Sequence, residues 1–314
     1  MKIIFFGLGS IGSRHARLLR RYFPQHDLYA LRSRRGDKDN TVQGVTELKG
    51  WEQVDEVRPQ AAFITNPTAL HIPTAIECAK RKMALFIEKP ISDSLGGLEE
   101  LLRVVENYDL VTYVAYVLRF HPVIVKLKEL LAQYPPRVMH VQAASFLPTW
   151  RPGRDHREIY SARQELGGGV LLDLSHEVDY VQYLLGPVRK VKACVERRGK
   201  VTVDTDDSAD LLIEAAQGFA NVHLSYLSHW PQRRIVVYSD AATLVGDFNA
   251  GTITIYAEGQ DPQRIDMPIE KDELFRRQLA YFLEHSQDTR MMNNIHEAKA
   301  VFESLLEMRR QDGA

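Results

Sequence analysis

Cysteine is scarce in this sequence of 314 residues: it has two, Cys78 and Cys194, and they lie far apart. They form no C-x-x-C pair, so neither a disulfide framework nor a cysteine-based zinc site is indicated. We therefore expect no bound metal. Unpaired cysteines are typical of a reducing compartment, and we expect a cytoplasmic protein.

An excess of charge of either sign is also missing. Lysine and arginine number 40 against 41 aspartates and glutamates, which gives a formal net charge of -1. This balance argues against nucleic acid or an anionic membrane surface as the partner. No apolar run is long enough to span a bilayer, and we find no repeats or low-complexity linker. Because 314 residues exceed what one hydrophobic core usually holds, two domains are expected.

The chain opens with an apolar run, residues 2–6, that leads directly into a G-x-G-x-x-G spacing. This order predicts a strand, a tight turn and a helix. Gly7 would allow the turn, Gly9 would let the backbone approach a pyrophosphate, and Gly12 would let the helix pack closely. An amphipathic pattern follows, so we predict a dinucleotide site; a βα turn without a ligand is the alternative. The residues assigned to this site are Gly7, Gly9, Ser10, Ile11 and Gly12.

The end of the second expected strand, residues 27–31, bears on the coenzyme. An acidic residue at this point of the fold bonds the ribose 2′-hydroxyl, whereas arginine accommodates a 2′-phosphate. Here the strand is followed by Arg32, Ser33 and Arg34, and no carboxylate appears before Asp37. We therefore favour NADP(H) over NAD(H), because guanidinium groups suit phosphate oxygens. A solvated basic loop would contain the same residues.

Strands and helices continue to alternate through the first half of the chain. Short apolar runs of the kind found in buried parallel strands predict strands at 61–65, 83–87 and 110–117. Helical spacing lies between them, at 72–79 and 95–105. This alternation indicates a doubly wound parallel sheet. The strand at 83–87 ends in Glu88-Lys89-Pro90, at the sheet edge where such folds bind ligands.

In the second half, a glycine triplet at 167–169 precedes a predicted helix. Its spacing places Asp173, His176 and Tyr180 on one face of that helix. His176 is a candidate acid or base near neutral pH; a core histidine bonded to a neighbour is the alternative.

The stretch 146–157 contains Trp150, Arg151, Arg154 and Arg157, and its arginines could clamp a carboxylate or phosphate of a substrate. Solvated loop arginines are the alternative interpretation.

Strands dominate after residue 188. Alternating apolar residues predict a hairpin of strands 209–215 and 220–226, and further strands at 235–238, 243–247 and 252–256. We interpret them as an antiparallel meander. Two helices, over 274–282 and 298–306, are expected to close the chain.

Several of these segments together resemble the Gfo/Idh/MocA oxidoreductase family. They are the opening glycine motif, Thr65-Asn66-Pro67 with His71, Glu88-Lys89-Pro90, Arg119-Phe120-His121-Pro122, and Gly167 to His176. The resemblance implies an N-terminal Rossmann domain, residues 1–120, and a C-terminal α/β domain with an open, mainly antiparallel sheet, residues 121–314. It also implies hydride transfer between NAD(P) and a hydroxyl or carbonyl carbon of a sugar, cyclitol or related small molecule.

The resemblance also assigns roles to individual residues. Lys89 matches the active-site lysine, Asp173 the substrate-binding aspartate and His176 the catalytic histidine. Two residues separate Asp173 from His176 where the family commonly has three, which shifts the histidine. Further coenzyme-binding candidates are Arg32, Ser33, Arg34, Thr65, Asn66, Pro67, His71, Glu88 and Lys89. Substrate-binding candidates are Arg119, Trp150, Arg151, Arg154, Tyr160, Asp173 and His176.

In the family, one face of the C-terminal sheet is commonly buried against a second subunit, so a homodimer or homotetramer is expected. The 146–157 stretch and the Asp-Leu-Ser-His-Glu motif look like members from sugar-nucleotide or nonulosonic-acid pathways. Two other interpretations stay open. The protein could be a catalytically silent NADP-binding sensor or scaffold, or a hydrolase or lyase that uses the nicotinamide transiently.

Overall fold

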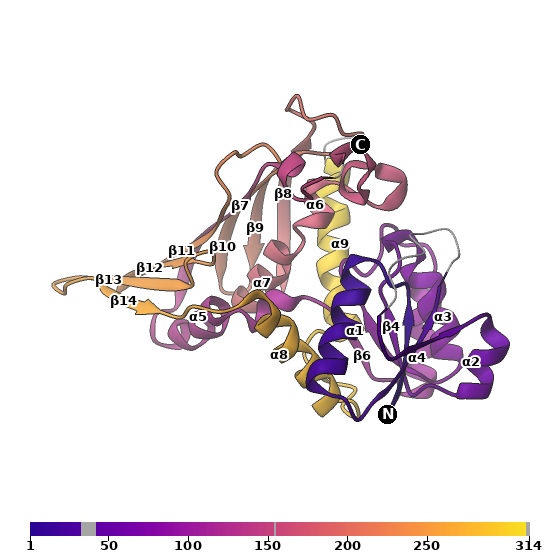
Figure 1. The fold of residues 1–314 in the computed structure, drawn as a ribbon. Coiled ribbons are helices and arrows are strands. Elements are labelled where there is room, and N and C mark those ends of the chain that lie inside the picture. The colour runs from indigo at the N-terminus through magenta and orange to yellow at the C-terminus, as the bar shows by residue number, and fades with distance from the viewer. Residues whose placement is uncertain (33–41, 154, 312–314) are drawn as a thin grey trace. The chain divides into compact units, whose positions relative to one another are not determined.

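The computed structural model describes residues 1–32, 42–153 and 155–311. It divides into two compact units (Figure 1). The first unit consists of Met1–Tyr116 and Lys271–Lys299, and the second of Val117–Glu270 and the chain from Ala300 onward. This division differs from the predicted boundary at residue 120, because a C-terminal segment belongs to the first unit.

The first unit contains a six-stranded sheet in the order β3-β2-β1-β4-β5-β6. All neighbouring strands in it are parallel, as predicted for a doubly wound sheet. The strands are β1 Lys2–Phe6, β2 Asp27–Leu31, β3 Val45–Leu48, β4 Ala61–Ile64, β5 Ala84–Ile87 and β6 Thr112–Val114. The order reverses direction on either side of β1, which puts the β1 and β4 ends at the switch point of the fold.

Helices connect these strands. They are α1 Ser10–Tyr22, α2 Trp51–Val57, η1 Thr68–Leu70, α3 His71–Lys80 and α4 Leu98–Tyr108. α8 Lys271–Glu284 also belongs to the first unit, and α9 Ile295–Gln311 begins in the first unit and continues into the second. The predicted helix after the glycine motif is confirmed: α1 buries Ala16, Leu18 and Leu19. α4 begins at Leu98, later than the predicted residue 95, because Gly97 adopts a left-handed conformation with φ +76°.

Aromatic packing explains why α8 belongs to the first unit. Phe63 of β4 and Phe86 of β5 stack with ring centroids 4.3 Å apart. Phe282 of α8 meets both rings edge-on, at 5.5 Å and 5.4 Å. The helical spacing of α8 could be predicted from the sequence, but its apolar face alone does not indicate which sheet it covers.

The second unit is built on an eight-stranded sheet in the order β14-β13-β12-β11-β7-β10-β9-β8. Its strands are β7 Pro136–Ala144, β8 Val188–Glu196, β9 Ser208–Ala215, β10 Gly218–Ser225, β11 Gln232–Ser239, β12 Ala242–Asp247, β13 Thr252–Ala257 and β14 Gln263–Asp266. The predicted β9–β10 hairpin is confirmed. The prediction of one continuous meander is wrong, because β7 lies between β10 and β11, parallel to β10. Local alternation predicts a strand without specifying its neighbours.

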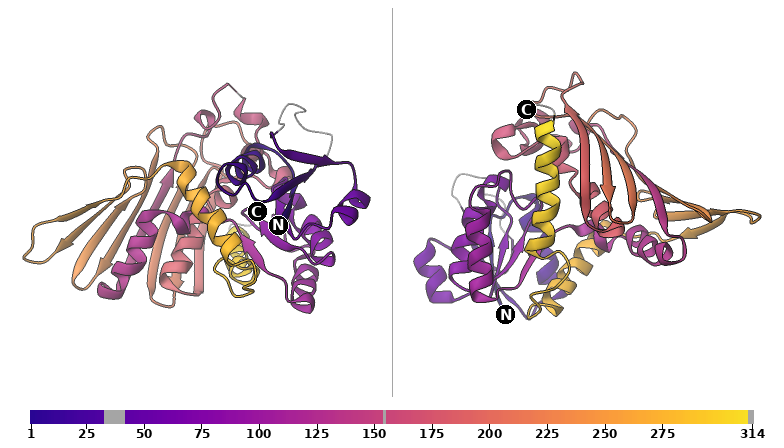
Figure 2. Two further views of the ribbon diagram at one scale, coloured as in Figure 1. Left: turned by 60° about the horizontal axis from the view of Figure 1, so that its bottom comes forward. Right: turned by 180° about the vertical axis from the view of Figure 1, so that it is seen from behind.

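Helices cover one face of this sheet, and no helix of the described residues covers the other, which we call the bare face (Figure 2). The covering helices are α5 Pro122–Gln133, α6 Val170–Asp173 and α7 His176–Leu185. Short 3₁₀ turns accompany them at η2 Val117–Phe120, η3 Leu147–Thr149, η4 His156–Glu158, η5 Tyr160–Ala162 and η6 Gln164–Leu166.

The predicted single helix after the glycine triplet is wrong in one respect. α6 ends at Asp173, and α7 begins at His176, with Leu174 and Ser175 between them. Leu174 leaves the helical conformation with φ -96° and ψ 27°. Serine competes with the backbone for hydrogen bonds and favours helix ends over helix interiors. Asp173 and His176 therefore belong to different helices, and the argument from one shared helix face does not hold.

Within the part of the chain that the structure describes, no helix combines the length and the apolar composition needed to cross a membrane.

Candidate functional site

The turn between β1 and α1 has no room for side chains at two of its glycines. Gly7 has a φ of +100°, and a Cβ there would lie 2.9 Å from the Asn66 backbone. A Cβ on Gly12 would lie 2.3 Å from the Gly7 carbonyl oxygen and 2.6 Å from Thr65 Oγ1. At Gly9, in contrast, an added Cβ would have no heavy atom within 4 Å. The turn is compact on its inner side and open at Gly9.

The first turn of α1 presents backbone donors at this opening. Gly9 is the N-cap residue, no side chain caps the helix, and the first turn contains no acidic residue. The first amides of a helix lack intrahelical partners and lie at the positive end of its dipole. Ser10, Ile11 and Gly12 thus provide N–H groups suited to an anion.

The loop after β4 is tied to the glycine turn. Thr65 Oγ1 donates a hydrogen bond to the Gly7 carbonyl oxygen at 2.5 Å. The Asn66 amide nitrogen donates to Thr74 Oγ1 at 2.9 Å, which leaves its Oδ1 buried and without a partner among the described residues. Pro67 follows as the residue that precedes η1. Asn66 therefore has an acceptor atom that a donor group on a ligand could meet.

His71 joins this loop to the segment that follows β5. Its Nδ1 lies 2.9 Å from the Pro90 carbonyl oxygen, and its Nε2 lies 2.9 Å from the Asn66 carbonyl oxygen. Burial lowers the pKa of His71, and the two carbonyl contacts oppose that shift. The side chain is 1% exposed, so His71 holds two segments of the candidate site together and has little surface for a ligand.

Lys89 lies directly beyond the carboxyl end of β5, partly exposed, and the peptide bond to Pro90 is cis. The preceding Glu88 is largely buried. Its Oε2 accepts the Lys89 backbone N–H at 3.3 Å, and its Oε1 lies 2.7 Å from His15 Nε2 on α1. Glu88 thus contacts both the backbone of Lys89, in the segment 88–90 that we call the tip of β5, and the helix α1 that follows the glycine turn.

Arg32 follows β2, as predicted, and forms an ion pair with a neighbouring strand. Its Nη1 donates to Glu47 Oε1 of β3 at 2.8 Å. The Glu47 side chain is 51% exposed, so this ion pair is accessible to solvent and to competing anions. Ser33 and Arg34, the other predicted contacts of a 2′-phosphate, lie outside the described residues.

In the second unit, Asp173 is bonded by two tyrosine hydroxyls. Tyr226 donates to its Oδ2 at 2.7 Å, and Tyr160 donates to its Oδ1. Asp173 is 4% exposed. Burial, reinforced by the Asp173 charge, raises the pKa of both tyrosines well above the usual range, so both remain proton donors. The arrangement suits Asp173 to hold Tyr160 and Tyr226 in place.

Asp206 fixes the start of α6 beside this group. Its carboxylate accepts the Leu171 N–H at 2.8 Å, and its carbonyl oxygen accepts the Val170 N–H at 3.0 Å. A Cβ on Gly169 would lie 2.4 Å from the Asp206 carboxylate. The glycine triplet therefore permits a close approach that anchors the short helix carrying Asp173.

His176 is the first residue of α7 and is partly exposed. Its neighbour Glu177 is fully buried and forms an ion pair with Arg233 Nε of β11 at 2.8 Å. This pair attaches the first turn of α7 to the sheet and so fixes the backbone from which the histidine projects.

The predicted substrate-binding residues lie in different environments. Arg119 is 4% exposed and forms a bidentate ion pair with Asp179, at 3.0 Å and 2.7 Å, which accounts for its guanidinium without a ligand. This does not favour its predicted contact with substrate.

Trp150 meets Tyr226 edge-on at 5.2 Å, and its indole N–H donates to Ser145 Oγ at 2.8 Å. Arg151 is close enough to Tyr160 to lower its pKa slightly against the effect of burial. Arg154 lies outside the described residues.

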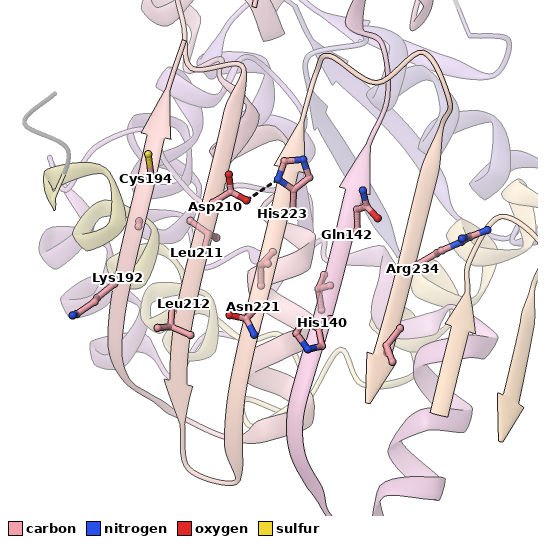
Figure 3. Close-up of a pocket in the computed structure, with 14 residues that line it drawn as sticks. His140, Gln142, Lys192, Cys194, Asp210, Leu211, Leu212, Asn221, His223 and Arg234 are labelled. Carbon is pink, nitrogen blue, oxygen red and sulfur yellow. Dashed lines mark hydrogen bonds and ion pairs between the residues drawn. The ribbon is translucent and has the colours of Figure 1, made fainter. Parts of the chain in front are cut away.

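The bare face of the second sheet carries a separate hollow of about 670 Å³ (Figure 3). Polar side chains from neighbouring strands point into it, among them His140, Asn221 and Arg234. On its floor, His223 Nδ1 and Asp210 Oδ1 lie 2.7 Å apart. The described residues that line it include none of the predicted site residues. Over the same described part of the chain, no group of three or more His, Cys, Asp or Glu side chains is arranged to hold a metal ion.

Comparison with known proteins places both units in one family. Residues 1–116 match the model of an oxidoreductase family with an NAD-binding Rossmann fold, GFO_IDH_MocA, and residues 135–245 match the GFO/IDH/MocA C-terminal domain. The chain belongs to the Gfo/Idh/MocA family. The resemblance inferred from the motifs is therefore confirmed.

Two curated relatives of this Gfo/Idh/MocA protein have different reactions in their names. Myo-inositol 2-dehydrogenase of Thermotoga maritima is 24% identical over 309 residues, covering 92% of this chain and 84% of that protein. 2,7-Anhydro-N-acetylneuraminate hydratase of Mediterraneibacter gnavus is 22% identical over 211 residues, covering 64% of this chain and 55% of that protein.

Solved structures share the fold at low identity. UDP-N-acetylglucosamine 3-dehydrogenase GnnA from Acidithiobacillus ferrooxidans superposes with a TM-score of 0.80 at 20% identity, covering 99% of this chain and 97% of that chain. Levoglucosan dehydrogenase in complex with NADH superposes with a TM-score of 0.87 at 14% identity, covering 100% and 97%. At these identities the likeness concerns the fold alone.

The residues of the first unit fit the nicotinamide dinucleotide that the family's Rossmann fold implies. The opening at Gly9 leaves space for a diphosphate beside the uncapped first turn of α1. The buried, unpartnered Asn66 Oδ1 supplies an acceptor on the neighbouring loop. Gly9, Ser10, Ile11, Gly12 and Asn66 are the residues that would hold the coenzyme.

Two contacts were absent from the sequence-based site. His15, whose partner is Glu88, falls on the buried face of α1, so the sequence indicates a core residue. Its fixed spacing from the glycine motif is the one signal that could have indicated a role in the site. Tyr226 was predicted as a strand residue alone. Its pairing with Asp173 joins residues 53 positions apart, which no local pattern can indicate.

The Asp173–Tyr226 contact predicts a specific effect of pH on stability. Above a pH of about 10 the unfolded chain loses the tyrosine proton, whereas the folded chain keeps it because the folded pKa is raised. Stability from this phenol is therefore lost as the pH rises above that value. We predict that Tyr226→Phe reduces the alkaline fall in unfolding free energy by up to about 1.4 kcal/mol per pH unit, measured by urea denaturation over a pH series.

At neutral pH the same variant should cost about 1–3 kcal/mol, because Asp173 loses a buried donor. The matched control is Tyr108→Phe on α4, whose side chain is 46% exposed and should change neither quantity. Equal alkaline slopes for the two variants would contradict the prediction.

Proposed function

We propose that this Gfo/Idh/MocA protein is an NAD(P)-dependent oxidoreductase that transfers a hydride between nicotinamide and a hydroxyl or carbonyl carbon of a sugar, sugar nucleotide or related polyol. One observation carries the proposal. The first unit combines an open diphosphate cradle at Gly9 to Gly12 with Lys89, which follows directly on the carboxyl end of β5. In doubly wound sheets ligands bind at that end of the strands.

The coenzyme, when bound, supplies or accepts the hydride through its nicotinamide ring. In the oxidation direction His176 accepts the proton of the substrate hydroxyl. Lys89, as a cation, stabilises the negative charge that develops on that oxygen. Asp173 accepts the O–H groups of Tyr160 and Tyr226 and so fixes both phenols, whose oxygens remain hydrogen-bond acceptors.

The substrate class is proposed from the names of the relatives. One is an inositol dehydrogenase, and solved structures with the same fold include dehydrogenases of levoglucosan and of a UDP-linked amino sugar. These are polyhydroxylated rings. Trp150, which is partly exposed and packs edge-on against the buried Tyr226, offers the aromatic surface that the C–H faces of such rings favour.

A second function is favoured by one relative, the Mediterraneibacter gnavus hydratase. A hydratase reaction is not a net oxidation, so a chain of this type would take a hydride and return it. Product formation without a lasting change in the absorbance of the reduced coenzyme would identify this case.

Lys89→Ala is the direct test of the catalytic proposal. We predict that turnover falls by at least about two orders of magnitude, because one positioned catalytic group usually contributes that much. The assay follows oxidation of the reduced coenzyme by a panel of keto-sugars and, in the other direction, reduction of the oxidised coenzyme by cyclic polyols. The control is Lys128→Ala, a lysine of the second unit whose amine donates to the Tyr183 carbonyl oxygen. Near-normal turnover of the Lys89 variant would refute the assignment.

The proposal includes NADP(H) as the preferred coenzyme, supported by Arg32 at the end of β2. A charge-assisted contact is worth about 1.5–3 kcal/mol, so Arg32→Ala should reduce the ratio of kcat/KM for NADPH to that for NADH by about tenfold to a hundredfold. Glu47→Gln should raise the ratio, because Glu47 competes with phosphate for the guanidinium. Arg103→Ala, on the exposed side of α4, is the control. A ratio below one in the unmodified protein would refute the preference.

The proposal also includes a homodimer or homotetramer formed through the bare face of the second sheet, and a cytoplasmic location supported by the free thiols Cys78 and Cys194. Leu212 lies on that face beside the hollow of Figure 3 and is 43% exposed. Leu212→Arg should shift the protein toward the monomer in sedimentation velocity, because it places a charge in the interface. Val125→Arg, on α5 and also 43% exposed, should leave the assembly unchanged. A monomeric unmodified protein would contradict this expectation.

A further inference from the structure

His15 forms a buried contact whose purpose the fold alone does not explain. It lies on α1, is 0% exposed, and its Nε2 is 2.7 Å from Glu88 Oε1, a residue 73 positions further along the chain. A carboxylate can only accept hydrogen bonds, so the ring nitrogen facing it is the donor. The other nitrogen, Nδ1, is buried and has no partner among the described residues.

The surroundings of this contact are aromatic. The His15 ring meets Phe86 at 5.1 Å, Phe275 at 5.6 Å and Phe63 at 6.1 Å, in each case edge-on. Arg14 closes this side of the cluster by stacking over Phe275 at 4.7 Å. An apolar side chain would fill such a space at lower cost, since burying a polar group is unfavourable unless it is hydrogen-bonded. The histidine is therefore best explained by its partner, Glu88.

Glu88 transmits this contact to Lys89. Its backbone N–H donates to the Ile64 carbonyl oxygen at 2.9 Å, so its position at the end of β5 is fixed by the sheet. Its side chain is 11% exposed, with one oxygen on His15 and the other accepting the Lys89 backbone N–H at 3.3 Å. Without the His15 donor the Glu88 carboxylate would be free to rotate toward other donors, and the Lys89 backbone would lose its acceptor.

We propose that His15 is a positioning residue that, through Glu88, holds the backbone of Lys89 in its active orientation. The helix whose first turn faces the coenzyme diphosphate then also fixes the tip that carries the lysine. The inference rests on the proposed function of Lys89, and it adds a residue that does not itself touch coenzyme or substrate.

The test compares His15→Leu with His15→Gln. Glutamine places an amide N–H where the Nε2 proton of histidine lies, whereas leucine fills the space without a donor. His26→Leu, which removes a histidine between α1 and β2 of the same unit, is the control for loss of an imidazole. Three quantities are measured: kcat at saturating coenzyme, coenzyme Kd by fluorescence titration, and hydrogen exchange of the 86–90 segment in coenzyme-free protein by mass spectrometry.

We expect His15→Leu to lower kcat by about tenfold to a hundredfold, because small displacements of a catalytic group have effects of that size. Its coenzyme Kd should stay within about threefold of the unmodified value, since the glycine turn is untouched. Exchange at the Lys89 amide should become faster. His15→Gln should restore most of the kcat and most of the protection of the Lys89 amide from exchange. His26→Leu should behave as the unmodified protein.

Unchanged kcat and unchanged exchange in a folded His15→Leu protein would overturn the inference. So would a raised coenzyme Kd with normal kcat, which would assign His15 to binding, or a failure of His15→Gln to restore either readout, which would assign it to stability. Lys89→Ala is measured in parallel. If that variant turns over normally, the proposed catalytic role is lost, while the exchange data still report whether His15 holds the tip.

Discussion

The structure of the first unit depends on the close backbone approach at the end of β1. Neither Gly7 nor Gly12 has space for a Cβ, because the Asn66 backbone and the Gly7 carbonyl oxygen already occupy it. Each larger residue would push the loop after β4 away from the first turn of α1. Since His71 then links Asn66 to the Pro90 carbonyl oxygen, a displacement at the glycine turn would reach the segment after β5 as well.

In the second unit, the main constraint is the burial of a carboxylate. Asp173 is almost fully enclosed, and an isolated charge there would be strongly unfavourable. Two phenols, kept neutral by the same burial, supply the donors that make it tolerable. The result is a rigid hydrogen-bonded group, with Trp150 packed against one of its tyrosines. Rigidity of this kind is what a substrate-orienting surface requires.

The sequence allowed the parallel sheet, the glycine turn and the position of Lys89 at a strand end to be predicted, because each depends on residues close together in the chain. Pairings between distant residues could not be predicted. The Glu88–His15 contact, the insertion of β7 between β10 and β11, and the packing of Phe282 on the first sheet all depend on the folded arrangement. The break between α6 and α7 was missed because helical periodicity persists through Leu174 and Ser175.

Helix α8 has a consequence for how this protein can be divided. The chain leaves the first unit after Tyr116 and returns to it at Lys271, so neither unit is one continuous stretch of sequence. A fragment ending at residue 270 would carry all six parallel strands and the glycine turn, yet the aromatic rings of β4 and β5 would face water where Phe282 now covers them. Such a fragment would expose an apolar surface prone to aggregation. Synthesis on the ribosome meets the same condition, since the first sheet waits for its cover until residues 271–284 have emerged.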